Sequence, residues 1–191
     1  SRPLVQVDGS GLAPSPSTRI ITDTIGSKCP TAADGSTCVQ TWADPADPQM
    51  YFVTFSDSPS SRHSWDGLVQ HARERGLVLH NHMINSGCIV FCDGGSEYMK
   101  DFEAACSAAG IIIRRSTPHA KDGLNQIAEG VNARAQQHAR VAMLHAAQHF
   151  EHIGFRVRDY WPQAYSFSAL QNRARTLASR GGLSFEQCRR A

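Results

Sequence analysis

The chain has 191 residues, 41% of them hydrophobic, and a formal net charge of +2 from 19 basic and 17 acidic side chains. This length suits one well-buried α/β domain with tails, and the nearly balanced charge excludes a polybasic tail or a highly charged disordered chain. The apolar runs are too short to span a membrane and the first residues lack a signal-peptide pattern, so we expect a soluble, intracellular protein.

The first part of the chain is predicted to be mostly irregular. A strand-like run, LVQVD, covers residues 4–8 and ends in Asp8. Residues from about 11 to 50 are rich in Pro, Gly, Ser and Asp, which indicates a long surface insertion. Because the chain starts without methionine and almost directly in a strand, we expect it to be part of a longer polypeptide.

The middle of the chain predicts strands and helices in alternation. A strand is expected at 51–57, and after the turn SPSS a hairpin partner strand is expected at 62–69. A short, poorly defined helical region follows, and then a strand at 88–92. Helical spacing of apolar residues predicts a helix over 98–110, followed by the strand IIIRR at 111–115.

Two helices are predicted in the last third of the chain. A long helix covers about 126–150, with a narrow stripe formed by Ile127, Val131, Ala135, Ala139, Ala142 and Ala146. The last helix covers about 159–178. This order of elements indicates a mixed sheet with helices on its faces. We expect a core over 1–150 and a C-terminal helical extension over 151–191.

Three carboxylates fall at the ends of predicted elements. Asp8 ends the first strand, Asp93 follows the strand at 88–92, and Glu129 lies in the first turn of the long helix. Asp93 opens the stretch DGGSEY, which is also compatible with an ordinary turn. Oxygen ligands that converge from such positions suit Mg²⁺, and a pair of such ions can clamp the oxygens of a phosphodiester.

Several segments resemble the catalytic core of a retroviral-type integrase, in particular the copia-like retrotransposon group. LVQVDGSG is similar to the motif of the first-strand aspartate, and YFVTFSDSPSSR to the family's Tyr-Phe-x-x-Phe-x-Asp-Asp-Tyr-Ser-Arg segment. CDGGSEY resembles Asp-Asn-Gly-Gly-Glu-Phe. GIIIRRSTPH and NQIAEGVN resemble the strand, loop and helix that carry the last glutamate, 35 residues after the second aspartate. YWPQAYSFSALQNR resembles the helix that follows.

The resemblance implies an RNase H-like α/β fold with a mixed five-stranded sheet flanked by helices. It also implies a polynucleotidyl transferase that processes the 3′ ends of element DNA and joins them to target DNA. Asp8, Asp93 and Glu129 fall on the family's catalytic positions, where they would bind two Mg²⁺ or Mn²⁺ ions. Asp57 competes with Asp8 because it also ends a strand, but it lies on a strand expected to be farther from the site. Glu97 is expected to support the site without binding metal.

The same resemblance implies partners and a location. DNA contacts are expected from the long helix and the loop before it, at His119, Lys121, Asn125, Gln126, Asn132 and Arg134. The family's DNA-gripping lysines are replaced by Ala133 and Gln136, and Gln126 stands where a hinge glycine is common. We expect a homo-oligomer that acts in the nucleus after passage in virus-like particles. An N-terminal zinc-binding domain and a C-terminal domain are expected in the full-length protein.

Two other functions stay open. One is a degenerate or domesticated core that binds DNA or assembles without catalysis, and the other is a nuclease of the ribonuclease H or resolvase type. The spacing of His145, His149 and His152 could bind zinc, but a solvated helix face is the favoured interpretation. The six cysteines show no paired motif and are interpreted as free thiols, with pairing or metal binding by Cys29 and Cys38 as the less favoured alternative.

Overall fold

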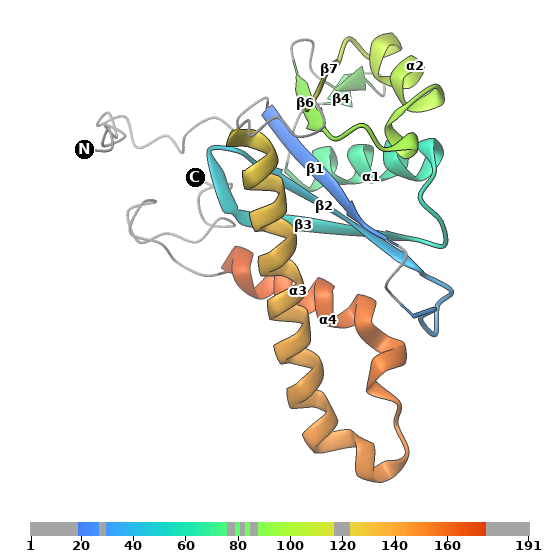
Figure 1. The fold of residues 1–191 in the computed structure, drawn as a ribbon, viewed down its shortest axis with the longest axis vertical. Coiled ribbons are helices and arrows are strands. Elements are labelled where there is room, and N and C mark those ends of the chain that lie inside the picture. Colours follow the sequence, from blue (N-terminus) through green and yellow to red (C-terminus); the bar gives the residue numbers. More distant parts are fainter. Residues whose placement is uncertain are drawn as a thin grey trace, which may run out of the picture.

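The structure is a computed structural model that describes residues 19–26, 30–75, 79–80, 83–84, 88–116 and 123–174 (Figure 1). It contains a five-stranded sheet with the strand order β3-β2-β1-β6-β7 and a separate two-stranded sheet of β4 (Leu79–His80) and β5 (Met83–Ile84). The predicted fold class is confirmed. This is a mixed α/β sheet flanked by helices, as in RNase H-like proteins.

The main sheet changes direction at its central strand, β1 (Arg19–Ile25). On one side β1 pairs antiparallel with β2 (Cys38–Asp44), which pairs antiparallel with β3 (Asp47–Ser56). On the other side β1 runs parallel to β6 (Ile89–Cys92), which runs parallel to β7 (Ile112–Arg115). The carboxyl ends of β1 and β6 therefore lie at the same edge of the sheet.

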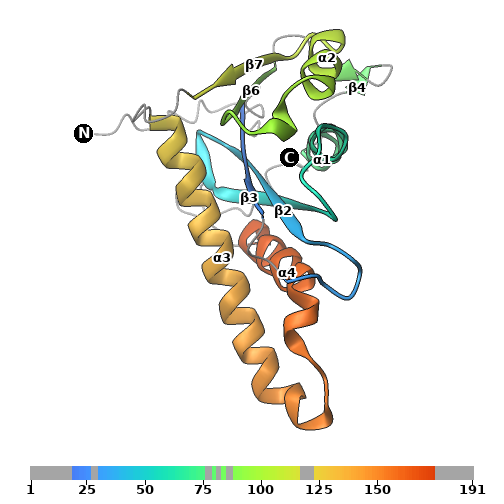
Figure 2. The ribbon, with the colours of Figure 1, turned by 45° about the vertical axis from the view of Figure 1, so that its right-hand side comes forward.

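Helices cover both faces of this sheet (Figures 1 and 2). One core cluster packs α1 (Ser61–Glu74) and α2 (Asp101–Ala108) on one face, through residues such as Leu68 and Phe102. The other packs α3 (Gly123–Phe150) and α4 (Trp161–Ala174) on the opposite face, and its members include Ile21, Tyr51, Val131, Ala135, Ala139, Trp161 and Tyr165.

The prediction of an irregular insertion at about 11–50 is wrong for its described part. That stretch contains β1, β2 and the start of β3, and β2 is almost completely buried. Trp42 lies in one core cluster while Val39 and Ala43 lie in the other, so β2 is covered on both faces. The Pro- and Gly-rich residues that indicated a loop flank these strands. The predicted strand at 4–8 lies outside the described residues.

The prediction of a hairpin strand at 62–69 is also wrong, because these residues belong to helix α1. The side chain of Ser60 caps the helix by accepting a hydrogen bond of 3.3 Å from the backbone amide of His63. The buried positions Ser64, Gly67, Leu68, His71 and Ala72 recur at helical spacing. The apparent alternation in RHSWDGLV was too short to distinguish the two-residue period of a strand from the period of a helix.

The short helical region predicted before the strand at 88–92 is only partly correct, because residues 70–74 belong to α1 whereas β4 and β5 are strands. The other predicted elements are confirmed, with adjusted ends. β3, β6 and β7 correspond to the predicted strands, and α2, α3 and α4 to the predicted helices. Gly110, just after α2, adopts a positive φ of 71°. The apolar stripe of α3 is buried at Val131, Ala135 and Ala139 but not beyond. From there α3 continues past the edge of the sheet, and the chain returns through α4 (Figure 2).

The cysteines that the structure describes are buried free thiols, as predicted: Cys38, Cys88, Cys92 and Cys106. In the described part of the chain, no helix is long and apolar enough to cross a membrane.

Candidate functional site

An aspartate that sequence reasoning missed lies in the central strand. Asp23 is partly buried in β1, on the face that α3 covers, as shown by the packing of its neighbours Ile21 and Ile25 against the α3 cluster. Its Oδ1 accepts a hydrogen bond of 2.8 Å from the backbone amide of Thr24, and its Oδ2 accepts one of 2.6 Å from the Asn132 amide group. Asp23 is therefore held in a fixed orientation toward α3.

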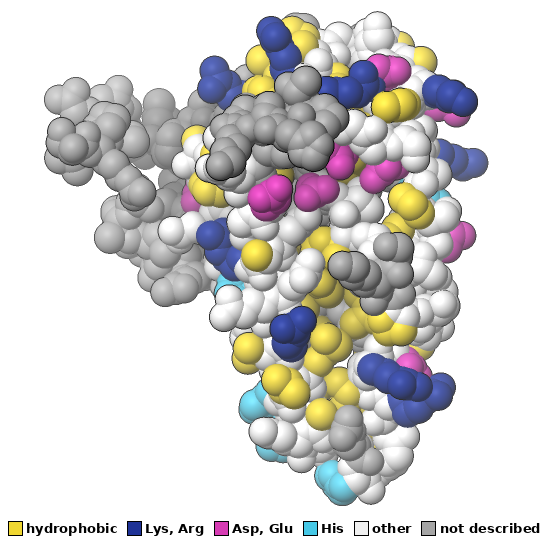
Figure 3. All heavy atoms as spheres, in the orientation of Figure 1, with side chains coloured by type: hydrophobic (Ala, Val, Ile, Leu, Met, Phe, Trp, Pro, Cys, Tyr) yellow, Lys and Arg dark blue, Asp and Glu magenta, His cyan; other side chains and the backbone are white. Residues whose placement is uncertain are grey.

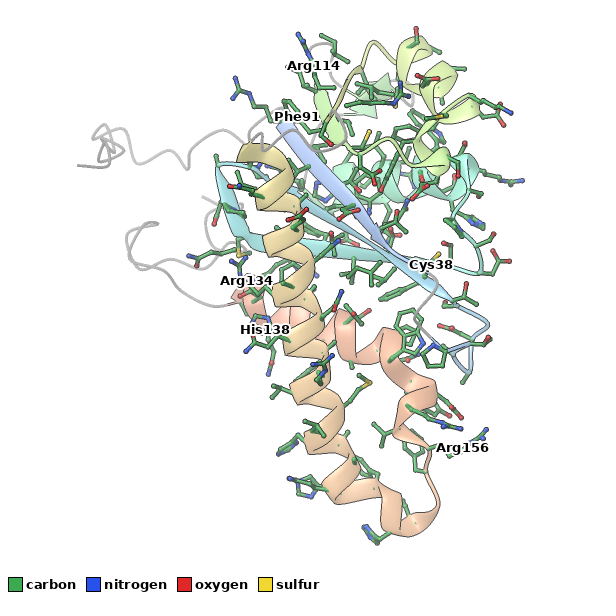
Figure 4. The ribbon with its side chains drawn as sticks, in the orientation of Figure 1. Cys38, Phe91, Arg114, Arg134, His138 and Arg156 are labelled. Atoms are coloured by element: carbon green, nitrogen blue, oxygen red, sulfur yellow. The ribbon has the colours of Figure 1, made fainter. Side chains whose placement is uncertain are left out.

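Asp93 follows β6 and is level with Asp23. The parallel register pairs Ile21 with Phe91, so two further residues along each strand bring Asp23 next to Asp93. Strands in a sheet are separated by roughly 4.8 Å. Phe91, labelled in Figure 4, packs against the α3 cluster, and Asp93 has the same parity in its strand. The two carboxylates thus emerge from adjacent strands on the same face.

A glycine holds the Asp93 carboxylate next to that of Glu97. The backbone amide of Gly95 donates a hydrogen bond of 2.9 Å to Asp93 Oδ1. A Cβ at Gly95 would lie 2.6 Å from Glu97 Oε2 and 2.9 Å from Asp93 Oδ1, so a side chain there would displace these carboxylates. The glycine allows the two carboxylates to approach the same stretch of backbone.

Glu129 extends the acidic group from α3. The sequence placed Glu129 in the first turn of this helix. The helix begins at Gly123 rather than at 126, so Glu129 lies in its second turn. It precedes Asn132 by three residues and therefore lies on the same side of the helix. The Glu129 side chain is exposed. Figure 3 shows Asp and Glu side chains gathered in a row beside the upper part of α3.

Burial and the negative charges of the neighbouring carboxylates raise the pKa of Asp23 to about 6. Burial is the largest cause, and the Thr24 hydrogen bond opposes it. The negative charges of Asp93, Glu97 and Glu129, in that order, raise the pKa further. The four carboxylates therefore form one electrostatically coupled group.

A buried tyrosine supports β1 from the opposite face. The Tyr98 hydroxyl lies 2.9 Å from Thr24 Oγ1 and 3.3 Å from Thr22 Oγ1. Burial raises the pKa of Tyr98 well above its ordinary value, so the ring stays neutral. Tyr98 thereby fixes the two threonines that flank Asp23 and links the strand to the segment that contains Glu97.

The donor chemistry of this group fits a hard divalent cation, since all four side chains offer carboxylate oxygens. Their positions are not those of a closed metal site. Among the residues that the structure describes, no three or more His, Cys, Asp or Glu side chains are arranged so that they could hold a metal ion. The same finding applies to the predicted alternative at His145, His149 and His152, all of which are exposed.

Asp8 and Asp57 are the two residues predicted as candidates for the first carboxylate. Asp8 lies outside the described residues. Asp57 follows β3, an edge strand that β2 and β1 separate from β6, and it is exposed and 3.6 Å from His63. It therefore lies away from Asp93, as expected.

The residues predicted to contact DNA fall into three groups. His119 and Lys121 lie outside the described residues, and Asn125 lies in α3 without a described side chain. Gln126 is exposed.

The other two make internal contacts. Asn132 is buried, and its amide group bonds Asp23 and Thr41, so the prediction that it contacts DNA is not supported by its position. Arg134 donates a hydrogen bond of 2.6 Å to the Pro48 carbonyl. In Figure 4, Arg134 and His138 follow one another along one side of α3.

The sequence did contain a signal for Asp23. Residues 20–25 read IITDTI, in which every residue except the aspartate is β-branched. Such a run favours a strand, and a single carboxylate within it is unusual for a half-buried position. The flanking Pro, Gly and Ser residues obscured this pattern.

Comparison with known proteins shows the fold but no closer kinship. No family model matches the chain, and neither does any curated protein. A chain in the cryo-EM structure of the simian T-cell lymphotropic virus intasome in complex with PP2A regulatory subunit B56 gamma is similar, with a TM-score of 0.61 and 13% identity. The match covers 91% of this chain and 54% of that chain. The protein thus shares the fold of that chain and spans about half of its length.

Proposed function

We propose that this chain is the catalytic core of a retrotransposon-type integrase, with Asp23, Asp93 and Glu129 as its catalytic carboxylates. The observation that carries the proposal is the parallel register of β1 and β6, which brings Asp23 level with Asp93 on the face covered by α3. Asp23 replaces Asp8 as the first carboxylate of the family's pattern. The 35 residues between Asp93 and Glu129 and the integrase-like fold support the same function.

The proposed reaction consists of two substitutions at phosphorus. First, a water oxygen bonds to a phosphorus near the 3′ end of element DNA, and the bond to the neighbouring 3′ oxygen breaks, which leaves a free 3′ hydroxyl. That hydroxyl then bonds to a phosphorus of target DNA and displaces the target's own 3′ oxygen, which takes the proton. Neither step needs an oxidant, a reductant or a covalent bond to the protein.

The residues of the site prepare it for this chemistry. Two Mg²⁺ or Mn²⁺ ions, held by Asp23, Asp93 and Glu129, would supply charge neutralisation at the attacking and leaving oxygens. Asn132 and the Thr24 amide orient Asp23, and the Gly95 amide orients Asp93. These hydrogen bonds limit the motion of the two aspartates, whereas the carboxylates would still have to move closer together to hold an ion.

This function implies partners and a location. Element ends and target DNA are the proposed substrates. Two ends must be joined together, which favours a homo-oligomer, and access to host DNA requires the nucleus, with virus-like particles as the earlier compartment. These assignments depend on the proposed reaction.

The experiment that tests the proposal compares five single substitutions, of which Asp23→Asn and Asp8→Asn decide the position of the first carboxylate. Joining of a pre-processed DNA end to target DNA is measured with Mg²⁺ or Mn²⁺ and with the full-length protein. Joining should fall to background in Asp23→Asn, Asp93→Asn and Glu129→Gln and remain in Asp8→Asn and Asp57→Asn. Activity that depends on Asp8 but survives Asp23→Asn would contradict the assignment of Asp23.

A second candidate is a core that has lost catalysis and acts as a DNA-binding or assembly module. The observation that favours it is that no closed metal site is present among the described residues. The exposed Ala133 and Gln136, at positions where the family often has lysine, agree with it. An unmutated chain with neither strand joining nor any rise in melting temperature with Mn²⁺ would establish this function over the integrase.

A third candidate is a nuclease of the ribonuclease H or resolvase type. The position of Glu97 favours it, because such enzymes usually carry a fourth carboxylate and Glu97 lies beside Asp93. Cleavage of an RNA–DNA hybrid or a branched DNA, without strand joining, would distinguish it from the integrase.

A further inference from the structure

The two faces of the sheet are covered unequally beside the four carboxylates. α3 packs mainly on β1, β2 and β3, so β6 and β7 lie at the margin of its cover. On the face of α1 and α2, Val90 and Cys92 of β6 are buried in the core. On the face of α3, Ile89 and Phe91 of the same strand are only partly buried. The parallel half of the sheet is therefore partly open on the side of α3.

The edge strand β7 continues this open face. The register pairs Ile112 with Ile89 and Arg114 with Phe91. Paired side chains of neighbouring strands lie on the same face of a sheet. Ile113, between the two, points the other way and packs against the α1 and α2 cluster. Ile112 is 47% exposed and Arg114 is exposed as well. In Figure 4, Arg114 and Phe91 lie near one another at the upper end of the sheet.

The two consecutive arginines of β7 have different surroundings. Arg115 donates hydrogen bonds to the Glu103 carboxylate and to the Tyr98 carbonyl, so it is used within the fold. The Arg114 side chain forms no hydrogen bond or ion pair with any residue that the structure describes. An exposed guanidinium without an internal partner keeps its N–H donors available for a ligand.

The arginines of α3 offer no comparable charge beside the site. Arg134 donates a hydrogen bond of 2.6 Å to the Pro48 carbonyl. Arg140 is exposed, but it follows Glu129 by about three helical turns, which is roughly 16 Å along the helix axis. A cation that acts next to the carboxylates is therefore offered by β7 and not by α3.

Arg114 is close to the carboxylates through its strand. Its register partner Phe91 precedes Asp93 by two residues. With strands roughly 4.8 Å apart and a rise of about 3.3 Å per residue, the backbones at Arg114 and Asp93 are separated by roughly 8 Å. One extended chain can therefore contact the guanidinium and the carboxylate site in succession. Figure 3 shows Lys and Arg side chains above the row of acidic side chains.

We propose that Ile89, Phe91, Ile112 and Arg114, here called the β6–β7 strip, guide a DNA strand into the four-carboxylate site. The Arg114 guanidinium would donate hydrogen bonds to a backbone phosphate, for which its planar fork is suited. The apolar side chains beside it would contact a sugar or the face of a base. Because the carboxylates repel the DNA backbone, a cation next to them offsets part of this repulsion. The inference rests on the proposed function, which supplies the DNA substrate, and it makes Arg114 a positioning residue.

The test measures binding of a labelled DNA duplex to the whole 191-residue chain by fluorescence anisotropy, without divalent metal. Arg114→Ala should weaken binding about tenfold, as expected for the loss of one charge-assisted contact. It should also reduce the slope of log affinity against log salt concentration by about 0.9, the value for one phosphate contact. Arg114→Lys should restore part of the affinity because it keeps the charge. The melting temperature should stay that of the wild type, because the side chain has no internal partner.

Two further variants locate the strand on the protein. Arg140→Ala is the matched control, because it removes the same charge from an exposed position on α3. Its affinity for DNA should change by less than about twofold, since salt screens a charge that makes no contact. Ile112→Gln should weaken binding and leave the salt slope unchanged, because it removes an apolar contact and no charge. In strand joining, Arg114→Ala should raise KM for DNA more than it lowers kcat.

Four results would overturn the proposal. One is a loss of affinity in Arg140→Ala but not in Arg114→Ala, because the strand would then follow α3. Another is tighter binding of polyglutamate than of DNA, which would make an acidic protein segment the occupant. The third is an equal loss in Arg114→Lys and Arg114→Ala with lowered melting temperatures, which would make Arg114 a structural residue. The fourth is absence of DNA binding by the unmutated chain.

The outcomes for the strip and for the proposed reaction are distinguishable. If DNA binding depends on Arg114 but the unmutated chain never joins strands, the proposed reaction fails and the strip remains as part of a DNA-binding module. If strand joining depends on Asp93 and proceeds unchanged in Arg114→Ala, the strip fails and the reaction remains.

Discussion

Asn132 on α3 donates a hydrogen bond of 2.6 Å to Asp23 in β1, a residue 109 positions earlier in the chain. The same amide group accepts a hydrogen bond of 2.5 Å from the Thr41 hydroxyl in β2. A single side chain therefore ties the helix to two neighbouring strands of the sheet. It also bonds one oxygen of Asp23, a half-buried carboxylate of the candidate site, which makes Asn132 a positioning residue in the proposed function.

Replacement of Asn132 by alanine should lower the free energy of unfolding by roughly 1 to 3 kcal/mol, because it leaves Asp23 and Thr41 without a buried partner. Urea denaturation at neutral pH measures this change. The matched control is Gln136→Ala, an exposed position one turn further along α3, which should change stability by less than about 0.5 kcal/mol. Equal effects of the two substitutions would show that the Asn132 bonds contribute nothing to stability.

The raised pKa of Asp23 predicts how stability depends on pH. The folded protein keeps this proton up to about pH 6, while the unfolded chain releases it near the ordinary aspartate pKa of 3.8. The stabilising contribution is therefore complete below about pH 4 and is lost as the pH rises through 6. Above that pH the ionised carboxylate costs on the order of 2 to 3 kcal/mol.

Asp23→Asn removes this dependence and should be more stable than the wild type at pH 7.5 but not at pH 3.5. Thermal unfolding at both pH values measures the difference. Under the proposed function, Mn²⁺ should raise the melting temperature of the wild type at pH 7.5 and leave Asp23→Asn nearly unchanged. If the difference in melting temperature between the two proteins were the same at both pH values, Asp23 would not be the group that titrates.

Two adjacent glycines offer a matched pair next to Asp93. In Gly95→Ala the new Cβ would collide with the ends of the Glu97 and Asp93 side chains, whereas at Gly94 it would meet nothing within 4 Å. Because the displaced Glu97 atoms belong to a flexible side chain, Gly95→Ala should remain folded, with stability within about 1 kcal/mol of the wild type. Its melting shift with Mn²⁺ should shrink, while that of Gly94→Ala should persist. Equal shifts would mean that the positions of these carboxylates do not govern cation binding.

A second pair of glycines tests the packing of α1 on the sheet. A Cβ at Gly67 would lie 2.8 Å from both Thr54 Oγ1 and Trp42 Cζ2, which are fixed in the core. Gly67→Ala should therefore destabilise the protein by roughly 1 to 3 kcal/mol. Gly130→Ala, on the exposed side of α3 with nothing within 4 Å, should stabilise it by roughly 0.5 to 1 kcal/mol. Chemical denaturation measures the free energy of unfolding of both variants. An unchanged free energy of unfolding in Gly67→Ala would contradict the close packing of α1 on the sheet.

The success of the sequence predictions followed the length and clarity of each pattern. α3 was predictable because its apolar stripe repeats over several turns, and β6 because its apolar residues end directly in Asp93. α1 was misread because eight residues could not separate the helical from the strand period. β1 and β2 were missed because Pro, Gly and Ser around them indicated loops, while their burial depends on strands and helices distant in sequence.

The candidate site was predictable to the same degree. Asp93 and Glu129 were found from their motifs and their spacing. Asp23 was missed together with its strand, and Asp8, which lies outside the described residues, was predicted as the first carboxylate. The position of Asn132 could not be derived from α3 alone, because its burial depends on the approach of β1 and β2. Local patterns therefore identified the residues of this site that lie at element ends, and missed those that only the tertiary structure brings together.

The central position of β1 also has a consequence for the order of folding. β1, β2 and β3 follow one another closely and can form an antiparallel meander by themselves, but β6 pairs with β1 only after more than sixty further residues have been synthesised. Until then one edge of the innermost strand stays open, with apolar residues on both sides of Asp23. Open edges of this kind recruit strands from other chains. During synthesis, the charge of Asp23, not yet covered by α3, would act as a gatekeeper that limits such pairing until β6 arrives.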